Sequence, residues 1–260
     1  MMTFTKRDPH AAEGFYRTEA AGLRWLGAAT ADGGLPVAEV LEVTATSITL
    51  PRYPTAAPTP EQAREFGRRL ALTHRAGAAH HGAPPPGLGD GFIATLPLPH
   101  LAESPSHWGD FYAGCRVEPF ARAAADDGGL SRTGLDVVLR LCERLHHGDP
   151  ALTGPEVPAA RLHGDLWSGN VLWTTHGPLL IDPAAHGGHP ETDLAMLALF
   201  GLPHLDLVLD AYTGTAPLPD GWADRAPLHQ LHPLLVHAVL FGPSYGEQAV
   251  RAAEAAGALA

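Results

Sequence analysis

One stretch of the sequence, residues 161–183, constrains the fold more than any other. It reads RLHGDLWSGNVLWTTHGPLLIDP, and two short apolar runs at residues 171–173 and 179–181 flank a turn-like TTHGP segment. This pattern predicts a β-hairpin. Because the two outer ends of an antiparallel hairpin lie together, Asn170 before the first strand and Asp182 after the second should be neighbours. Asp165 lies on the loop just before them.

These three polar residues predict a site for phosphoryl transfer. Carboxylate and amide oxygens that converge on one point are ligands that Mg²⁺ prefers, so we expect Asn170 and Asp182 to bind the metal. Asp165 would be the catalytic base that accepts the proton of an attacking hydroxyl. Asp and Asn are also common in turns for conformational reasons alone, but the ordered set around a hairpin favours the functional interpretation.

Lys6 and Glu19 are predicted to form the pair that positions a nucleotide. Lys6 is the single lysine of the chain and lies in a strand-like segment. Residues 13–26 read as a helix, and Glu19 lies on its apolar stripe. A buried carboxylate needs a cation, and a strand lysine paired with a helix glutamate positions the phosphates in kinase folds. The alternative is that Glu19 lies at the edge of the stripe and reaches water.

The remaining pattern predicts an α+β, bilobal, protein-kinase-like fold. Residues 37–43 and 47–50 read as two more strands, and the proline-rich residues 53–60 read as a linker. Thr59, Pro60 and Gln62 then predict a capped helix start. We expect a small antiparallel-sheet lobe over residues 1–53 and a larger, mainly helical lobe with the catalytic loop over residues 54–260.

The segment after Asp182 is short. Pro183 follows directly, and a helical pattern resumes at Glu191. A protein kinase has a long segment here that holds a peptide, and this chain has no room for one. We therefore expect a small substrate.

Composition narrows the class of protein. Hydrophobic residues make up 45% of the 260 residues, as in ordinary globular proteins, and the formal net charge of −11 argues against nucleic acid or an anionic membrane as partner. We see no membrane span and no signal peptide. Cys115 and Cys142 give no disulfide framework, which favours a cytoplasmic location. The sixteen histidines lack metal-binding spacing, so we expect structural roles for most of them.

Several segments resemble the fructosamine (ketosamine) kinase family. They are LHGDLWSGNVLW, LLIDPAAHGGHPETDLAMLALFG and PLHQLHPLLVHAVLFGPSY, with GLGDGFIATLPLPH and WGDFYAGCR as further support. The resemblance covers nearly the whole chain. That family lies in the aminoglycoside-phosphotransferase-like group of the kinase-like fold. The Trp in HGDLWSGN and the DPA…ETDLAM segment are the specific parts, because HGDxxxxN alone also fits choline, homoserine and aminoglycoside kinases.

The resemblance implies an ATP- and Mg²⁺-dependent kinase that phosphorylates the 3-hydroxyl of a ketosamine, a sugar joined to an amine, in protein deglycation. The partner would be a small ketosamine or a glycated protein lysine. By motif position it implies the same roles as the residue pattern, with one addition: Asp165 as base, Asn170 and Asp182 as metal ligands, Lys6 and Glu19 as the ATP-positioning pair, and Trp167 beside the sugar.

The amine of a ketosamine is cationic, so the site should also carry acidic groups. Glu191 and Asp193 are candidates, although the start of a helix gives Glu191 a structural role as the stronger alternative.

Two departures from the family pattern keep other functions open. Family members carry a helix and two strands before the lysine strand, so we expect a truncated N-terminal lobe. The crossing between the lobes reads LPRY, and Pro51 has no backbone N–H for a hinge hydrogen bond. The alternatives are a kinase for another amine-bearing metabolite and a pseudokinase that binds without transfer.

Overall fold

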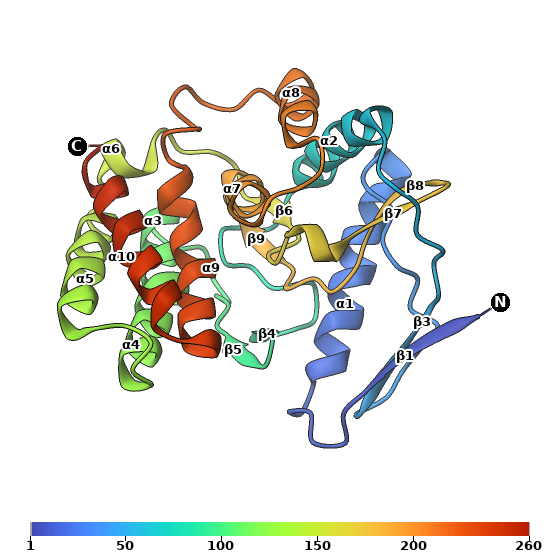
Figure 1. Ribbon diagram of the computed structural model, residues 1–260, viewed down its shortest axis with the longest axis horizontal. Helices are drawn as coiled ribbons and strands as arrows, with labels where there is room; N and C mark the ends of the chain where they lie inside the picture. The colour runs from blue at the N-terminus through green and yellow to red at the C-terminus, as the bar shows by residue number, and fades with distance from the viewer. Residues whose placement is uncertain (1, 260) are drawn as a thin grey trace.

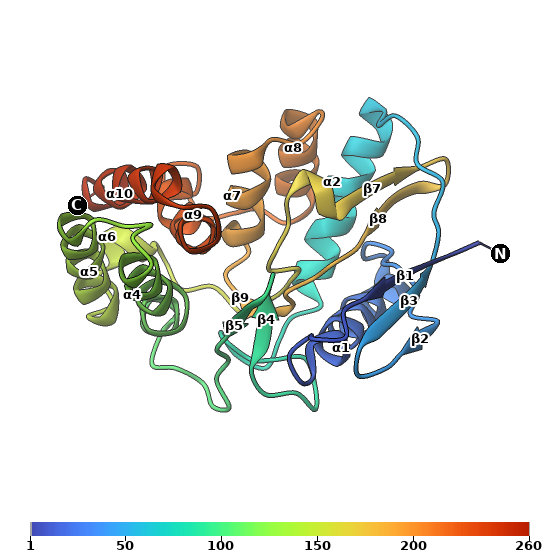
Figure 2. The same ribbon diagram turned by 60° about the horizontal axis from the view of Figure 1, so that its bottom comes forward.

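The computed structural model describes residues 2–259. The N-terminal strands β1 and β3 lie at one end of the molecule, and helices α4, α5, α9 and α10 gather at the other (Figure 1). Helices α2, α7 and α8 and the hairpin β7–β8 lie between these two groups when the molecule is turned (Figure 2).

The described residues contain helices of very different lengths. They are α1 (Phe15–Gly27), α2 (Pro60–Arg75), α3 (Trp108–Phe111), α4 (Glu118–Asp126), α5 (Arg132–His146), α6 (Pro150–Thr153), α7 (Glu191–Phe200), α8 (Leu205–Thr215), α9 (Ala226–Phe241) and α10 (Pro243–Gly257). Short 3₁₀ turns cover η1 (Ala28–Asp32) and η3 (Ser168–Asn170), and a π-helical turn covers η2 (Tyr112–Val117).

The strands are short and pair antiparallel. They are β1 (Thr3–Arg7), β2 (Glu42–Val43), β3 (Ser47–Pro51), β4 (Gly91–Ile93), β5 (Leu96–Leu98), β6 (Ala160–Leu162), β7 (Val171–Thr174), β8 (Gly177–Leu180) and β9 (His186–Gly188). The N-terminal sheet has the order β1-β3-β2, and the other pairs are β4-β5, β6-β9 and β7-β8.

The N-terminal sheet packs on α1. In the register of β1 and β3, Lys6 lies opposite Ile48, so these two side chains share one face of the sheet. Ile48 and Leu50 are buried with Leu23 of α1 in one apolar cluster. The sheet therefore presents the face that carries Lys6 to the helix that carries Glu19.

One predicted strand is much shorter than expected. The sequence favoured a strand over residues 37–43, but β2 contains Glu42 and Val43 alone. Upstream, Val37 forms a parallel bridge with Leu180 of β8, and the N–H of Ala38 donates to the carbonyl of Leu180. The backbone there pairs with the hairpin instead of with β3, so the segment joins two sheets.

Two further apolar clusters fix the helices. Phe66 and Leu70 of α2, Leu166 of the catalytic loop and Leu197 of α7 lie in one cluster with strands β7 and β8. The other apolar cluster is formed by residues of α3, α4, α5, α9 and α10. The loop that carries Asp165 is thus anchored on α2 and α7.

The mixed helix and sheet content agrees with the predicted α+β class. The start of α2 is as predicted, because Thr59 and Gln62 form a capping box with Pro60 in the first turn. None of the helices within the described residues is long and apolar enough to cross a bilayer. Cys115 and Cys142 are both free thiols.

Candidate active site

The loop between β6 and β7 carries His163, Gly164 and Asp165, and it folds tightly because of Gly164. Gly164 has a φ of +80°, and a Cβ there would lie 2.1 Å from the carbonyl oxygen of Ala184. Only glycine combines this backbone conformation with such a close approach. The loop therefore lies directly against the segment that follows Asp182.

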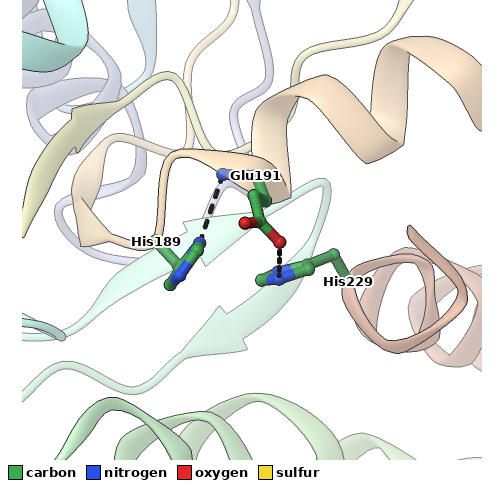
Figure 3. Close-up of side chains that lie close together, drawn as sticks. All are labelled: His189, Glu191 and His229. Atoms are coloured by element: carbon green, nitrogen blue, oxygen red, sulfur yellow. Dashed lines mark hydrogen bonds and ion pairs between the residues drawn. The ribbon is translucent and has the colours of Figure 1, made fainter. Parts of the chain in front are cut away.

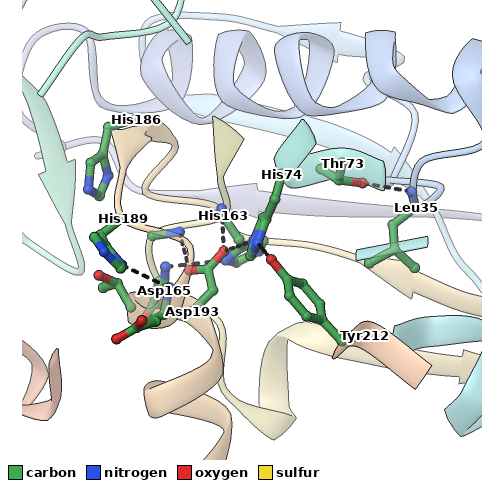
Figure 4. Close-up of polar contacts among 12 residues, drawn as sticks. Leu35, Thr73, His74, His163, Asp165, His186, His189, Asp193 and Tyr212 are labelled. Atoms are coloured by element: carbon green, nitrogen blue, oxygen red, sulfur yellow. Dashed lines mark hydrogen bonds and ion pairs between the residues drawn. The ribbon is translucent and has the colours of Figure 1, made fainter. Parts of the chain in front are cut away.

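Asp193, in the first turn of α7, holds this loop in place. Its carboxylate accepts hydrogen bonds from the backbone N–H groups of His163 and Gly164, at 2.8 and 3.0 Å. His74 of α2 contacts the same carboxylate through Nε2 at 3.1 Å and the Tyr212 hydroxyl through Nδ1 at 2.8 Å. Figure 4 shows these groups converging from separate elements. The loop is thereby tied to α2, α7 and α8.

The charge of Asp193 is maintained although the side chain is buried. Burial alone would raise its pKa, but the hydrogen bond and positive potential of His74, together with His163, outweigh burial, and the pKa of Asp193 is lowered. A carboxylate that accepts several hydrogen bonds favours its ionised form. Asp193 is therefore an ionised anchor beneath the loop.

Asn170 orients Asp165. The side-chain Nδ2 of Asn170 donates to the carbonyl oxygen of Asp165 at 2.8 Å and to its carboxylate oxygen Oδ2 at 2.9 Å. These contacts use the NH2 group of the amide. The amide oxygen is a separate acceptor and stays available as a metal ligand. Burial raises the pKa of Asp165, against the opposing effects of His163, the Asn170 hydrogen bond and His237. A raised pKa makes this carboxylate a better proton acceptor.

The predicted hairpin is present and brings its ends together. Val171 of β7 pairs with Leu180 of β8, and the N–H of Ile181 donates to the carbonyl of Asn170 at 3.1 Å. Asp182 follows with a φ of +54°, a backbone conformation that is uncommon for residues other than glycine. Strained residues of this kind concentrate at functional sites.

Lys6 contacts both Glu19 and Asp182. Its Nζ lies 2.8 Å from Oε1 of Glu19, and it also donates to Oδ1 of Asp182. The contact that the sequence predicted between Lys6 and Glu19 is thus present. Burial would lower the pKa of Lys6, but the two carboxylates outweigh burial and raise it, so the ammonium stays charged.

All six predicted site residues line one cavity of about 310 Å³. The predicted set is Lys6, Glu19, Asp165, Trp167, Asn170 and Asp182. The sequence reasoning did not assign the remaining lining residues, which are Phe15, Tyr16, Thr18, Phe92, Ala94, Pro183 and Ala184. The cavity lies between α1, the β4–β5 hairpin and the catalytic loop.

The hairpin β4–β5 supplies a wall that was missed. Its turn residue Ala94 has a φ of +47° and lines the cavity, as Phe92 does. Ala94 and Asp182 are two of the three residues other than glycine with positive φ in residues 2–259. The signal in the sequence is the GFIATLPLPH segment, which supports the family resemblance but does not place Phe92 and Ala94 in the site.

Trp167 lies at the mouth of the cavity. It is 41% exposed, unusual for a large aromatic side chain. Its ring passes so close to Gly169 that a Cβ there would lie 2.3 Å from the indole, and Phe200 meets the ring edge-on at 6.4 Å between centroids. The ring is therefore held on two sides and open on another.

Glu191 and Asp193, the candidates for binding a substrate amine, do not line the cavity, so that assignment is wrong; for Glu191 the stronger alternative, a structural role, agrees with its contacts. Asp193 is buried beneath the loop, and Glu191 is buried in an ion pair with Arg225. The Nε of Arg225 donates to Oε2 of Glu191 at 3.0 Å, and its Nη2 donates to Oε1 at 2.5 Å. A helix N-terminus and charged partners hold both carboxylates inward.

Two histidines join Glu191 in a compact group. The ligand atoms of His189, Glu191 and His229 lie within 4.8 Å of one another (Figure 3). Arg225 already contacts both carboxylate oxygens of Glu191, and a dication would add charge to a buried site that holds a matched pair. We therefore interpret the group as structural. It joins the start of α7 to α9.

Comparison with known proteins identifies the family. The fructosamine kinase family model matches residues 2–256. The chain belongs to the fructosamine kinase family. A probable ketoamine kinase of Enterococcus faecium is 33% identical over 258 residues, which cover 94% of this chain and 84% of that protein.

Solved structures agree with this family. The "putative fructosamine-3-kinase" of Thermobifida fusca has a TM-score of 0.89 and 47% identity, over 98% of this chain and 85% of that one. A macrolide 2′-phosphotransferase of Brachybacterium faecium, at 15% identity and a TM-score of 0.59 over 96% of this chain and 83% of that one, shares the fold alone. Membership of the fructosamine kinase family implies an enzyme with ATP as co-substrate, and kinases of this fold typically use a divalent metal.

Proposed function

We propose that this fructosamine kinase family member transfers the γ-phosphoryl group of ATP to a hydroxyl of a ketosamine. One observation carries the proposal: Lys6, Asp165, Asn170 and Asp182 line a single cavity although they come from distant parts of the chain. This combination of cation, base and oxygen ligands is what phosphoryl transfer requires. A kinase for another amine-bearing metabolite and a pseudokinase remain the alternatives that the test below separates.

Asp165 is proposed as the base. The substrate hydroxyl oxygen forms a bond to the γ-phosphorus, the bond from that phosphorus to the oxygen of the leaving ADP breaks, and the hydroxyl proton passes to the Asp165 carboxylate. The raised pKa of Asp165 supports this role, as does the Asn170 hydrogen bond that fixes the direction of the carboxylate.

Asn170 and Asp182 are proposed to hold Mg²⁺. Two oxygen atoms are available as metal ligands. The side chain of Asn170 contacts Asp165 through Nδ2, so its amide oxygen can bind the ion. Lys6 contacts one carboxylate oxygen of Asp182, and the second oxygen can bind the ion. Oxygen donors of this kind suit a hard dication. When bound, the ion would neutralise charge on the phosphates.

Lys6 and Glu19 are proposed to position the phosphates, with Glu19 holding Lys6 in place. Side chains two residues apart on a strand share one face, so Phe4 lies on the same side of β1 as Lys6, and it is exposed. We propose that the nucleotide base packs near Phe4. In this assignment residues 1–53 form the N-terminal lobe, which carries the phosphate-positioning pair, and residues 54–260 form the helical lobe, which carries the base and the metal ligands.

Trp167 is proposed as the wall for the sugar. It lies two residues after the base, lines the same cavity and keeps an open aromatic surface. Such surfaces pack against the apolar face of a sugar while polar groups fix the hydroxyls. The names of the relatives support a ketosamine as the acceptor. The substrate would be a small ketosamine or a glycated lysine of a protein, and the reaction would contribute to deglycation.

The test is a substrate panel. The chain is incubated with ATP, Mg²⁺ and one acceptor at a time, namely fructosyl-lysine, ribulosyl-lysine, choline, homoserine or an aminoglycoside, and products are identified by their mass shift. Preferential phosphorylation of a ketosamine supports the proposal. Preference for another acceptor supports the alternative kinase, and nucleotide binding without any transfer supports the pseudokinase.

A further inference from the structure

Arg116 is a buried cation without a carboxylate partner. It belongs to the π-helical turn η2 and is 1% exposed. Arg116 and Arg225 are the two buried arginines of residues 2–259. Arg225 pairs with Glu191, but no carboxylate of the described residues lies within 4.0 Å of the Arg116 guanidinium. A buried charge that lacks a partner costs stability.

One edge of the Arg116 guanidinium is occupied and the other is free. Nη1 donates to the carbonyl oxygens of Pro99 and Cys115, at 2.5 and 3.1 Å. The guanidinium carbon lies 4.7 Å from the centroid of the Phe111 ring. Nε and Nη2 are buried and have no hydrogen-bond partner in the part of the chain that the structure describes. Arginine binds a single anion through this edge, with two parallel N–H groups. The free edge is therefore a preformed bidentate donor.

The charge of Arg116 is present at neutral pH and also acts on three imidazoles. Burial lowers the pKa of Arg116 to about 9, which is still above neutral, and the carboxylate of Asp90 has the smallest of the effects on it. Burial and, after it, the positive charge of Arg116 lower the pKa values of His100 (to about 4), His186 and His232. All three imidazoles are therefore neutral, and they add no charge to that of Arg116.

The hydrogen bonds of these imidazoles show which of them can donate to an anion. His100 contacts the carbonyl of Gly89 through Nδ1 at 3.0 Å, and His186 contacts the carbonyl of Ala184 through Nδ1 at 2.9 Å. Their protons are therefore on Nδ1, and Nε2 of each is an acceptor. The Nε2 of His232 is buried and has no hydrogen-bond partner within residues 2–259. His232, on α9, is the imidazole that can hold its proton on the free nitrogen.

We propose that the free edge of Arg116 binds a small monovalent anion, either chloride or a planar oxyanion such as nitrate or formate. The ion would lie beside η2, with the end of β5 and α9 as neighbours and His232 as a further donor. It is small because the surrounding side chains are buried, and monovalent because a dianion would exceed the single positive charge. The inference does not rest on the proposed function, because Arg116 does not line the catalytic cavity.

An anion at this edge would also support the wall of the catalytic cavity. Nη1 of Arg116 holds the carbonyl of Pro99, directly after β5. The β4–β5 hairpin places Phe92 and Ala94 in the cavity wall. An ion that binds the folded chain and is released on unfolding stabilises the folded chain by mass action. The proposal therefore predicts that stability depends on the concentration of a small anion.

The experiment measures thermal unfolding of the unchanged chain while chloride replaces gluconate at constant ionic strength, so that screening stays the same. The unfolding temperature should rise saturably, by about 5 °C when chloride reaches roughly 100 times its Kd. Nitrate and formate should also give saturable rises. A temperature that does not depend on chloride in the unchanged chain contradicts the proposal.

Two variants assign the effect to Arg116. Arg116→Met removes the charge and keeps an unbranched side chain, so its unfolding temperature should not depend on chloride. Arg161→Met is the matched control, because the half-buried Arg161 also bonds backbone carbonyls and stacks on an aromatic ring, that of Trp25. This control should keep the chloride dependence. A saturable rise that persists in Arg116→Met would overturn the assignment.

A crystal of the unchanged chain grown in bromide gives a second measurement that does not require Arg116→Met to fold. Anomalous diffraction should place a bromide ion on the Nε–Nη2 edge of Arg116. Bromide at this position supports the proposal. Water alone at this position contradicts it, because hydration then satisfies the two donors.

Discussion

The ammonium group of Lys6 contacts the carboxylate of Asp182, although 176 positions of sequence separate the two residues. Lys6 also contacts Glu19 at 2.8 Å. A single cation thus joins the N-terminal sheet, α1 and the end of the hairpin. This contact places the proposed phosphate-binding group beside the proposed metal ligand.

Replacing Lys6 should lower the activity with ATP. Lys6→Met should lower kcat/KM for ATP about 100-fold, because a preorganised cation at the phosphates is lost. Arg7→Met is the matched control, because Arg7 is the next cation on the same strand, is exposed and has its side chain on the opposite face. Steady-state kinetics at varied ATP measures both. Equal losses in the two variants would remove Lys6 from the phosphate site.

Replacing Asp193 should loosen the catalytic loop. Asp193→Asn removes the carboxylate charge and leaves at least one of the two loop N–H groups or His74 without an acceptor, and we expect a loss of about 2 to 3 kcal/mol in the free energy of unfolding. Asp210→Asn, on the exposed face of α8, is the control and should be nearly neutral. Denaturant unfolding at neutral pH measures both variants.

The pH dependence of this effect has a defined sign. The pKa of Asp193 is lowered by folding, so its contribution to stability is present above the unfolded-state pKa of about 4 and is lost as the pH falls towards the folded-state value. The difference in unfolding free energy between the unchanged chain and Asp193→Asn should shrink below about pH 4. A difference that grows on acidification would contradict the assignment of Asp193 as an ionised anchor.

Gly164 and Gly128 have similar φ angles but different surroundings, so their variants distinguish the cost of backbone strain from the cost of a close contact. Gly164 and Gly128 have φ values of +80° and +76°, but a Cβ meets the Ala184 carbonyl at Gly164 and open space at Gly128. Gly128→Ala should cost about 1 kcal/mol for its conformation alone. Gly164→Ala should cost more and should also lower kcat, because the loop with Asp165 must move. Similar unfolding midpoints and similar kcat values for the two variants would contradict the tight loop.

Trp167→Ala tests the sugar wall. We expect about a tenfold rise in KM for the ketosamine, equal to ~1.4 kcal/mol, with the KM for ATP unchanged. Trp222→Ala, in the connection before α9, is the control for loss of an indole elsewhere. If the KM for ATP rose and that for the ketosamine did not, Trp167 would belong to the nucleotide side of the site.

The parts of the site that sequence could predict are those set by local pattern. The hairpin follows from two apolar runs around a turn, and its geometry alone makes Asn170 and Asp182 neighbours. Glu19 could be paired with Lys6 because a carboxylate on an apolar stripe requires a cation. Both inferences combine a local sequence pattern with one physical requirement, namely the geometry of a hairpin or the need of a buried carboxylate for a cation.

The parts that were missed depend on contacts between distant segments. Asp193 follows a helix start, where a carboxylate already has a local explanation, and its bonds to the loop some thirty positions earlier appear only in the folded chain. Phe92 and Ala94 become cavity residues because β4 packs on α1. Residues 37–38 read as a strand of the first sheet, yet they pair with β8. Periodicity indicates that a segment is extended but does not name its partner.

The most direct test of the proposed kinase activity compares the unchanged chain with Asp165→Asn. Phosphate transfer to fructosyl-lysine is measured for both proteins, and calorimetry measures their binding of Mg-ATP. We expect a mass shift of one phosphoryl group with the unchanged chain. In Asp165→Asn we expect kcat to fall at least about 100-fold and the affinity for Mg-ATP to stay nearly the same, because the variant lacks the base but keeps the metal ligands. Turnover of Asp165→Asn at the unchanged rate, or no phosphorylation of a ketosamine by a chain that binds Mg-ATP, would contradict it.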